Sequence, residues 1–259
     1  MSFQPPFQPV YAIGDIHGRM DALRETHDLI ARDGGEDAHI VHLGDLIDRG
    51  PESPAVIDHL MEGLAQGRNW QIVKGNHDNK LPRFLEDPGW IDPGTTSGLT
   101  WIGDARNGAA ATLLSYGIKD ADTRPQEDVQ AEALRKIPAE HALFLDGLAP
   151  YVLHPGGFLF VHAGIRPGID LSAQSRVDMM WIRKPFLESS ADHGALVVHG
   201  HTAIRAATHY GNRLNIDSGA GYGHPASAIR TSVICPRSGS KRSISGSVVL
   251  TSGKRSRTR

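Results

Sequence analysis

The chain has 259 residues and a mass of 28.0 kDa, which is enough for one large domain with a buried core. Hydrophobic residues make up 39% and charged residues 22%, and no stretch reaches the roughly 20 apolar residues of a membrane-spanning helix. Its start, MSFQPPFQPV, lacks the charged and apolar regions of a signal peptide. These features exclude fibrous and membrane architectures, and we expect a soluble, cytoplasmic protein with no membrane partner.

Apolar runs in the first third of the chain alternate with helical spacing. The runs at 10–13, 38–43 and 70–74 each end at a glycine followed by Asp or Asn, and helical spacing follows each of them, for example over 51–66. Strands that alternate with helices predict a parallel sheet. Their loops then meet at the carboxyl edge of the sheet, where open α/β sheets bind ligands.

The second half of the chain changes from helices to strands. Residues 88–108 are rich in Pro, Gly and Thr and predict an irregular excursion, a candidate lid. Helical spacing returns over 107–116 and 126–148, where Pro138 interrupts the second helix. One helical insert, 176–187, lies among predicted strands at 151–153, 158–162, 195–199, 207–210, 213–216 and 227–234. We expect one α/β domain over residues 1–235, with two packed β-sheets flanked by helices.

The single cysteine limits the kinds of metal site, and the distribution of charge limits the kinds of partner. Cys235 alone can form neither an internal disulfide nor a cysteine-based zinc site, so any metal must be held by His, Asp, Glu or Asn. The whole chain carries −2, but residues 236–259 contain seven Lys or Arg and no acid, which leaves residues 1–235 at −9. We therefore expect no specific nucleic-acid partner, and a basic Ser/Gly/Arg-rich tail over 236–259 that is largely disordered.

Six potential metal ligands follow predicted strands, each near a glycine or another small residue. They lie in the motifs GDIHG, GDLIDRG, GNHD, VHAG and HGHT, and they are Asp15, His17, Asp45, Asn76, His162 and His201. Any one of them alone is an ordinary turn residue. Together, six oxygen and nitrogen donors at strand ends are typical of a site for two divalent metal ions.

These motifs, in this order, resemble the signature of the phosphoprotein phosphatase family of calcineurin-like metallophosphoesterases. The stretches NGAAATLLSYG, FVHAGIRPG, MMWIR and NIDSGAGYG are similar to its bacterial and phage Ser/Thr protein phosphatase branch. The resemblance implies a calcineurin-like metallophosphoesterase fold of two packed mixed β-sheets flanked by helices (αββα). It also implies that Asp45 bridges two metals, with Asp15 and His17 at the first and Asn76, His162 and His201 at the second.

Cleavage of a phosphate monoester expels an alkoxide, and a positioned acid helps this step. His77 follows Asn76 directly, and Asp48 can accept a hydrogen bond from the His77 ring, orienting the imidazole and favouring its charged form. In the resembled family these two positions form the acid pair. Arg49 and Arg183 match the family's phosphate-binding arginines, and we expect Asn76 to contact the substrate phosphate as well.

Three further polar residues lie beside the motifs. Asp78 and Asp217 are candidate partners that orient a ligating histidine. His199 shares a strand face with His201, but residue 203 is Ala, so the GHxH spacing of chains with a second ligating histidine is missing. We expect His199 to be packed or to support the site indirectly.

We favour a dinuclear-metal-dependent phosphomonoester hydrolase, and first a serine/threonine protein phosphatase in which a metal-bridging hydroxide attacks directly. Two divalent ions, Mn²⁺ first with Fe or Zn as alternatives, would serve as cofactors, and the partner would be a phosphoprotein or a phosphorylated small molecule.

Three other functions remain open. The alternative is hydrolysis of diadenosine tetraphosphate or another dinucleoside polyphosphate, because such hydrolases share the GD and GNHD motifs. Asp48 argues against this alternative, since those hydrolases typically have a small residue there. A broad small-molecule phosphatase lies between the two, and a non-catalytic phosphate- or metal-binding module is the remaining class.

Overall fold

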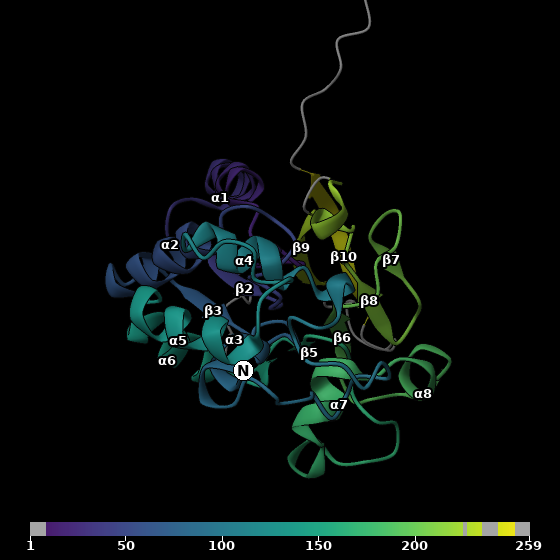
Figure 1. The fold of residues 1–259 in the computed structure, drawn as a ribbon. Coiled ribbons are helices and arrows are strands. Elements are labelled where there is room, and N and C mark those ends of the chain that lie inside the picture. The colour runs from purple at the N-terminus through teal and green to yellow at the C-terminus, as the bar shows by residue number, and fades with distance from the viewer. Residues whose placement is uncertain (1–8, 225–226, 235–242, 252–259) are drawn as a thin grey trace, which may run out of the picture.

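The first of two β-sheets is built around three parallel strands. The computed structural model describes residues 9–224, 227–234 and 243–251 (Figure 1). β1 pairs in parallel with β2, and β2 with β3, while β9 and β10 continue the sheet on the other side of β1 as antiparallel strands. The bounds of these strands are Val10–Ile13 for β1, His39–His42 for β2, Trp70–Ile72 for β3, Ser227–Ile234 for β9 and Ser243–Thr251 for β10.

The second sheet has the order β4-β5-β6-β8-β7. Its three inner strands, β5, β6 and β8, are parallel, and antiparallel pairing occurs only at the edges, between β4 and β5 and between β7 and β8. Hairpin-like pairing in this half therefore occurs only at the two edges. The bounds are Tyr151–His154 for β4, Phe158–Val161 for β5, Leu196–His199 for β6, Thr208–His209 for β7 and Arg213–Asn215 for β8.

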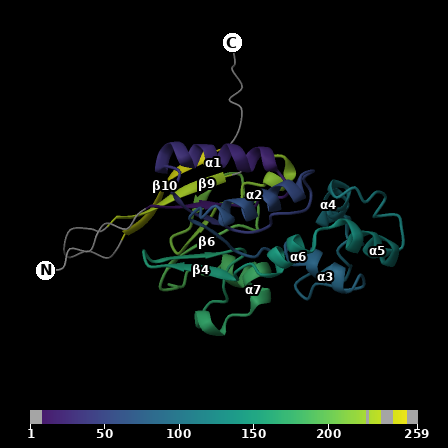
Figure 2. The same cartoon turned by 90° about the vertical axis from the view of Figure 1, so that its left-hand side faces the viewer.

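Helices cover the outer faces of both sheets. Figure 2 shows α1 above β9 and β10, and α7 beneath β4 and β6, which gives the predicted order of helix, sheet, sheet and helix. The helix bounds are Met20–Gly34 for α1, Ser53–Ala65 for α2, Lys80–Glu86 for α3, Ala109–Ser115 for α4, Gln126–Lys136 for α5, Ala139–Asp146 for α6, Arg176–Trp181 for α7 and Lys184–Leu187 for α8. In the part of the chain that the structure describes, no helix has the length and apolar character needed to cross a membrane.

Alternation along β1 shows how the layers are joined. Val10 and Ala12 belong to the apolar cluster between the sheets, which includes Phe160 of β5. Tyr11 and Ile13 belong to the cluster under the helices, which includes Leu23 of α1. Successive side chains of a strand point to opposite faces, so β1 is buried on both sides and its carboxyl end is held rigidly.

Part of the basic tail lies in the first sheet. Backbone pairing joins Ser243 to Ile234 and Thr251 to Ser227, so β10 runs along the whole of β9. Residues 243–251 are therefore paired, where the sequence led us to expect a largely disordered tail. Residues 235–242 and 252–259 lie outside the described residues, and the boundary at 235 stays a prediction.

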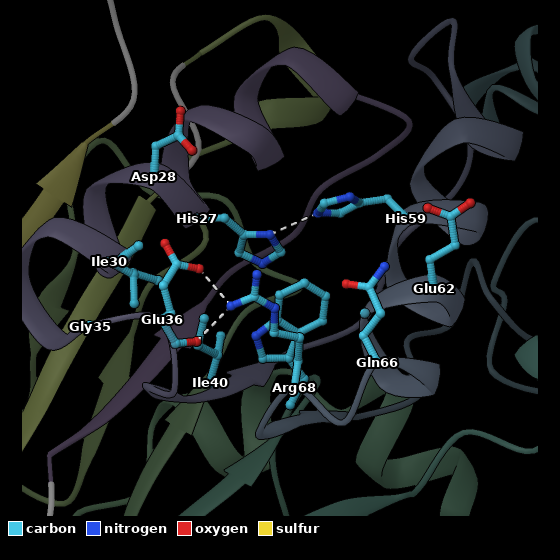
Figure 3. A pocket seen from close by; sticks show the side chains of 13 residues that line it. His27, Asp28, Ile30, Gly35, Glu36, Ile40, His59, Glu62, Gln66 and Arg68 are labelled. Carbon is cyan, nitrogen blue, oxygen red and sulfur yellow. Dashed lines mark hydrogen bonds and ion pairs between the residues drawn. The ribbon is translucent and has the colours of Figure 1, made fainter.

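A chain of three histidines lies between the first sheet and helices α1 and α2. His59 Nε2 is 3.0 Å from His27 Nδ1, as Figure 3 shows. His27 Nε2 is 2.9 Å from His42 Nε2, and His42 Nδ1 is 3.3 Å from the main-chain oxygen of Gln71. Because a carbonyl oxygen only accepts, His42 donates to Gln71. Burial lowers the pKa of His42 and His27 and so favours neutral rings, in which case His27 donates to His42 and His59 donates to His27. The Trp70 ring stacks on His27 at 4.4 Å.

These neutral imidazoles make stability depend on pH. Burial is the main reason that the pKa of His27 falls to about 2 and that of His42 to about 4. The unfolded chain therefore binds more protons below the ordinary histidine value of 6.5. Between pH 6.5 and 4, we expect each of the two to lower the free energy of unfolding by about 1.4 kcal/mol per pH unit as pH falls.

Urea denaturation across this pH range tests the contribution of His27. His27→Phe keeps a ring against Trp70 but cannot take up a proton. The free energy of unfolding of the variant should depend on pH less steeply than that of the natural chain, by about one proton. An unchanged slope would contradict a neutral, buried His27.

Candidate metal centre and active site

The six predicted ligands meet at the carboxyl ends of strands from both sheets. Asp15 and His17 follow β1, Asp45 follows β2 and Asn76 follows β3, whereas His162 and His201 follow β5 and β6 of the second sheet. The first five are at most 5% exposed, and His201 is partly buried. Face-to-face packing of the sheets thus brings together residues up to 186 positions apart in the chain.

Asp45 lies between two groups of donors. Its Oδ2 is 3.5 Å from Nε2 of His17, and its Oδ1 is 3.4 Å from Nε2 of His162, which in turn lies 3.1 Å from Oδ1 of Asn76. Asp15 Oδ2 lies 4.0 Å from His17 Nε2. One group of possible metal donors contains Asp45 with His17 and His77, and another contains Asp45 with His162 and His201. A carboxylate with one oxygen toward each group has the disposition of a bridging ligand.

The ligand loops are held in backbone conformations that most residues avoid. His17, Asp45 and His201 have φ values of 49°, 50° and 65°, and Asp48 and Arg49 have φ values of 73° and 69°. The left-handed region costs a non-glycine residue on the order of 1 kcal/mol. Neighbouring contacts therefore have to impose these conformations.

Asp78 supplies contacts of this kind. Its carboxylate accepts the N–H of Asp45 at 2.8 Å, of Leu46 at 2.7 Å and of Gly75 at 2.9 Å, which ties the GDLIDRG and GNHD loops together. The close approach also requires glycine, because a Cβ on Gly75 would lie 2.2 Å from the nitrogen of Asp45. Asp78 thus positions loop backbone and does not orient a histidine.

Main-chain carbonyls orient two of the histidines. His17 Nδ1 donates to the oxygen of Ile47 at 2.9 Å, and His162 Nδ1 donates to the oxygen of Leu43 at 2.8 Å. Each ring is therefore fixed with the lone pair of Nε2 toward Asp45. A fixed tautomer of this kind is typical of metal-binding histidines.

Two other predicted supporting residues lie near the donors. Asp217 accepts the N–H of Gly219 at 2.8 Å, and its negative charge raises the pKa of Asp15. His199 is fully buried against Phe186, with Nδ1 3.1 Å from the oxygen of Gly200. His199 therefore packs inside the second sheet and belongs to neither donor group.

The charges of these residues fit a pair of cations. Burial raises the pKa of Asp45 to about 6, and burial together with the charges of Asp217 and Asp45 raises the pKa of Asp15 well above its usual range. Crowded buried carboxylates ionise readily only beside positive charge. Nε2 of His201 is buried without a hydrogen-bond partner among the described residues. Carboxylate, amide and imidazole donors suit divalent ions such as Mn, Fe or Zn.

His77 and Asp48, the candidate acid pair, are in direct contact. His77 Nδ1 is 2.6 Å from Asp48 Oδ2, and the same carboxylate accepts Trp101 Nε1–H at 2.9 Å and the Thr112 hydroxyl at 2.8 Å. All three contacts hold Asp48, which has no exposed surface, in one orientation. Burial is the main reason that the pKa of Asp48 rises to about 6.

Two effects oppose the expectation that Asp48 favours the charged form of His77. Burial lowers the pKa of His77 well below its usual range, and the positive charges of Lys80 and Arg49 lower it further. The contact with Asp48 orients the ring, and its effect on the charge of His77 stays a prediction.

Arg49 contacts both a predicted metal ligand, His17, and the candidate acid, His77. Its Nη1 donates to Nε2 of His17 at 2.7 Å and its Nη2 to Nε2 of His77 at 3.1 Å. The guanidinium carbon lies 4.9 Å from the centre of the Tyr222 ring. Arg183 lies farther out, where Nη1 is 3.5 Å from the Thr202 hydroxyl.

A hollow of about 790 Å³ opens above these residues. Residues from the excursion, among them Thr95, Thr96 and Asn107, form one wall, and Trp181 and Tyr222 line other parts. Trp101, at 3% exposure, anchors the excursion through its bond to Asp48.

Three kinds of residue in the walls of the hollow or behind them were not predicted from the sequence. The first kind consists of residues that support the acid pair, the second of aromatic side chains in the walls, and the third is a buried lysine. They are Trp101, Thr112, Trp181, Tyr222 and Lys80. Trp181 and Tyr222 occur in the quoted stretches MMWIR and NIDSGAGYG, but only their position beside the donors distinguishes them from core residues.

Comparison with known families agrees with this arrangement. The model of the calcineurin-like phosphoesterase family matches residues 8–241. The chain belongs to this family. Its fold and its two groups of metal donors are accordingly those of a metal-dependent phosphoesterase, as the motifs led us to expect.

Similar proteins with curated names are bacterial. A bis(5'-nucleosyl)-tetraphosphatase of Bacillus velezensis is 27% identical over 84% of this chain and 87% of its own length, and that of Bacillus subtilis is 27% identical over 84% and 88%. A solved structure provisionally described as a diadenosine tetraphosphatase has a TM-score of 0.60 at 18% identity and covers 97% of both chains. A protein-tyrosine phosphatase of Shewanella has a TM-score of 0.52 at 16% identity, covering 95% of this chain and 80% of its own.

The bridging position of Asp45 predicts a specific loss of metal. Asp45→Asn should lower the content of bound Mn²⁺ from about two ions per chain to one or fewer, because the amide has no negative charge for either ion. Metal analysis after gel filtration measures this content. Asp146→Asn, which changes an exposed carboxylate paired with Lys74 and Arg83, is the matched control, and full metal content in Asp45→Asn would contradict the bridge.

Proposed function

We propose that the protein hydrolyses dinucleoside polyphosphates such as diadenosine tetraphosphate, in a reaction that depends on two divalent metal ions, Mn²⁺ first. The observation that carries this proposal is the size and lining of the hollow over the donors. A single phosphoryl group needs only a small part of about 790 Å³. The remaining space suits a longer, highly charged substrate.

Positive charge extends across this hollow beyond the reacting position. Arg49 lies at the donors, and Arg183 and Lys184 line the hollow farther out, together with Arg106, whose guanidinium pairs with Asp104 of the same lining. The chain as a whole is slightly acidic, at −2. Several cations along one hollow match the successive charges of a polyphosphate.

Two aromatic rings in the walls can receive a nucleoside. Tyr222 is 67% exposed and lies over Arg49, and Trp181 forms part of the wall beside His201, with ring centres 5.7 Å apart. Exposed aromatic rings stack on bases of any sequence. The names of the similar bacterial proteins support the same substrate class.

The presence of Asp48 is only weak evidence against this substrate class. A leaving phosphate needs little protonation, so the cleavage of dinucleoside polyphosphates does not require Asp48 as part of an acid pair. In the structure, however, Asp48 also accepts hydrogen bonds from Trp101 and Thr112, which fix the excursion and α4 beside the site. This structural role exists whatever the leaving group is.

Each predicted site residue would have its own role in the reaction. When bound, the two ions would activate a water molecule and neutralise phosphoryl oxygens, held by the six predicted ligands. Arg49 would turn its two donors from His17 and His77 to phosphate oxygens, and Arg183 would bind a phosphate farther along. With Arg49 turned away, Nε2 of His77 would be free to carry a proton, and His77, oriented by Asp48, would then stand beside the departing group as a proton donor.

Hydrolysis of phosphoserine or phosphothreonine in proteins is the second candidate. The observation that favours it is the short His77–Asp48 contact of 2.6 Å, because an alkoxide leaving group needs an acid more than a phosphate does. Both candidates share the same metals, ligands and phosphate contacts. They differ in the leaving group and in how much of the hollow the substrate fills.

A direct comparison of substrates decides between the two. With Mn²⁺ present, kcat/KM for diadenosine tetraphosphate should exceed that for a phosphothreonine peptide by about tenfold or more, because only the longer substrate contacts the outer cations. The products should be resolved by ion-exchange chromatography. Faster turnover of the peptide would instead establish the second candidate.

Arg183→Ala tests the outer contact. Loss of this guanidinium should lower kcat/KM for diadenosine tetraphosphate by about tenfold, and that for p-nitrophenyl phosphate by much less, because the small substrate does not extend that far. Arg166→Ala is a matched control, since Arg166 pairs with Asp178 outside the hollow. Equal losses for both substrates in Arg183→Ala would place Arg183 at the reacting phosphoryl group.

A further inference from the structure

A buried lysine at the acid pair has no hydrogen-bond partner within the described chain. Lys80 is 2% exposed, and its Nζ neither touches solvent nor meets an acceptor. Lysine is rarely buried in this way, because its ammonium has three donors to satisfy. Apart from its effect on the pKa of His77, Lys80 has no part in the metal, acid-pair and arginine functions described above.

The backbone places Lys80 directly beside His77. Lys80 is the first residue of α3, and its N–H donates to the oxygen of His77 at 3.1 Å. The Trp181 ring lies over the ammonium at 4.4 Å from Nζ. Trp181 in turn lines the hollow, so one indole ring separates the charge from the substrate space.

Both signs of charge act on the ammonium. Burial lowers the pKa of Lys80, whereas the carboxylates of Asp92, Asp48 and Asp45 raise it, and Arg49 lowers it. Asp92 is itself 5% exposed, and its Oδ2 has no hydrogen-bond partner among the described residues. Lys80 forms no ion pair among the described residues, so these carboxylates act on the ammonium from a distance and offset only a part of the effect of burial.

A fixed cation beside the acid pair has a definite effect on the leaving group. It attracts negative charge that develops on the departing oxygen, and the low dielectric under Trp181 strengthens this attraction. A leaving group that departs as an anion gains from this in full. An alkoxide that receives a proton from His77 as it departs gains less, because its oxygen ends neutral.

We propose that the buried ammonium of Lys80 stabilises leaving groups that depart as anions, such as phosphate and aryloxide. Lys80 thereby favours substrates with these leaving groups over substrates that release an alkoxide. The proposal extends the proposed function, since one product of dinucleoside polyphosphate cleavage departs as a phosphate anion. It differs from the acid function of His77, which favours alkoxides. The two residues therefore act in opposite directions on substrate preference.

Steady-state kinetics of the full chain with Mn²⁺ test this opposition. We would measure kcat/KM of the natural chain, Lys80→Met, Lys80→Arg and His77→Asn on diadenosine tetraphosphate, p-nitrophenyl phosphate and a phosphothreonine peptide. Lys80→Met should lose about tenfold or more on the first two substrates and clearly less on the peptide. Lys80→Arg should regain most of the loss, and His77→Asn should show the reverse order.

Controls separate this effect from structural damage. Bound Mn²⁺ and the thermal midpoint are measured for every variant. Lys74→Met removes another buried lysine, 7% exposed, whose Nζ donates to the main-chain oxygen of Asp146 at 2.8 Å outside the hollow. It should lower stability while leaving the ratios of kcat/KM between substrates unchanged.

The outcomes separate the two proposals. Equal losses on all substrates in Lys80→Met, no loss on any, or no recovery in Lys80→Arg would overturn the inference about Lys80. If the natural chain does not cleave diadenosine tetraphosphate, the proposed function fails. The inference is then decided by p-nitrophenyl phosphate, on which Lys80→Met should lose more than His77→Asn.

Discussion

Concentrated negative charge at the carboxyl ends of the strands is the constraint that organises this molecule. Burial raises the pKa of Asp15, Asp45 and Asp217, the charges of Asp217 and Asp45 raise that of Asp15 further, and the charge of Asp45 raises that of Asp217 further. The histidines beside them are held neutral by burial, so they cannot balance this charge. Arg49 and Lys80 offset a part of it, and the donor geometry leaves the remainder for metal ions. Charge balance thus links the ligands, the phosphate-binding arginine and the buried lysine.

A rigid frame of hydrogen bonds keeps these charges in place. Asp78 joins two ligand loops through three backbone N–H groups. Asp48 holds the acid histidine and, through Trp101, one wall of the hollow. The same carboxylates that would be costly if unpaired therefore fix loops in left-handed conformations. Outside this frame the hollow is cationic and partly aromatic, which favours long anionic substrates and leaves a protein substrate as the second choice.

Local sequence predicted the elements well because each is set by short-range pattern. The strands β1, β2 and β3 are apolar runs that stop at glycine, and Pro138 separates α5 from α6 as expected. The second half was harder to predict. Its inner strands are parallel although little helix connects them. Their order, β5-β6-β8, depends on which strands pair in space. Pairing of β10 with β9 likewise depends on a partner strand and not on the composition of a basic, Ser-rich segment.

The sequence by itself determined which side chains form the centre: six donors beside glycines at strand ends, with an acid pair and Arg49 in the same motifs. This was possible because metal chemistry restricts residue type, and glycine permits the close turns. Only the tertiary structure decided what surrounds them. The lowered pKa of His77, the cover of Trp181 over Lys80 and the extent of the hollow result from burial and from the packing of segments distant in the chain. Burial sets pKa values and cavity shape, and no local pattern encodes it.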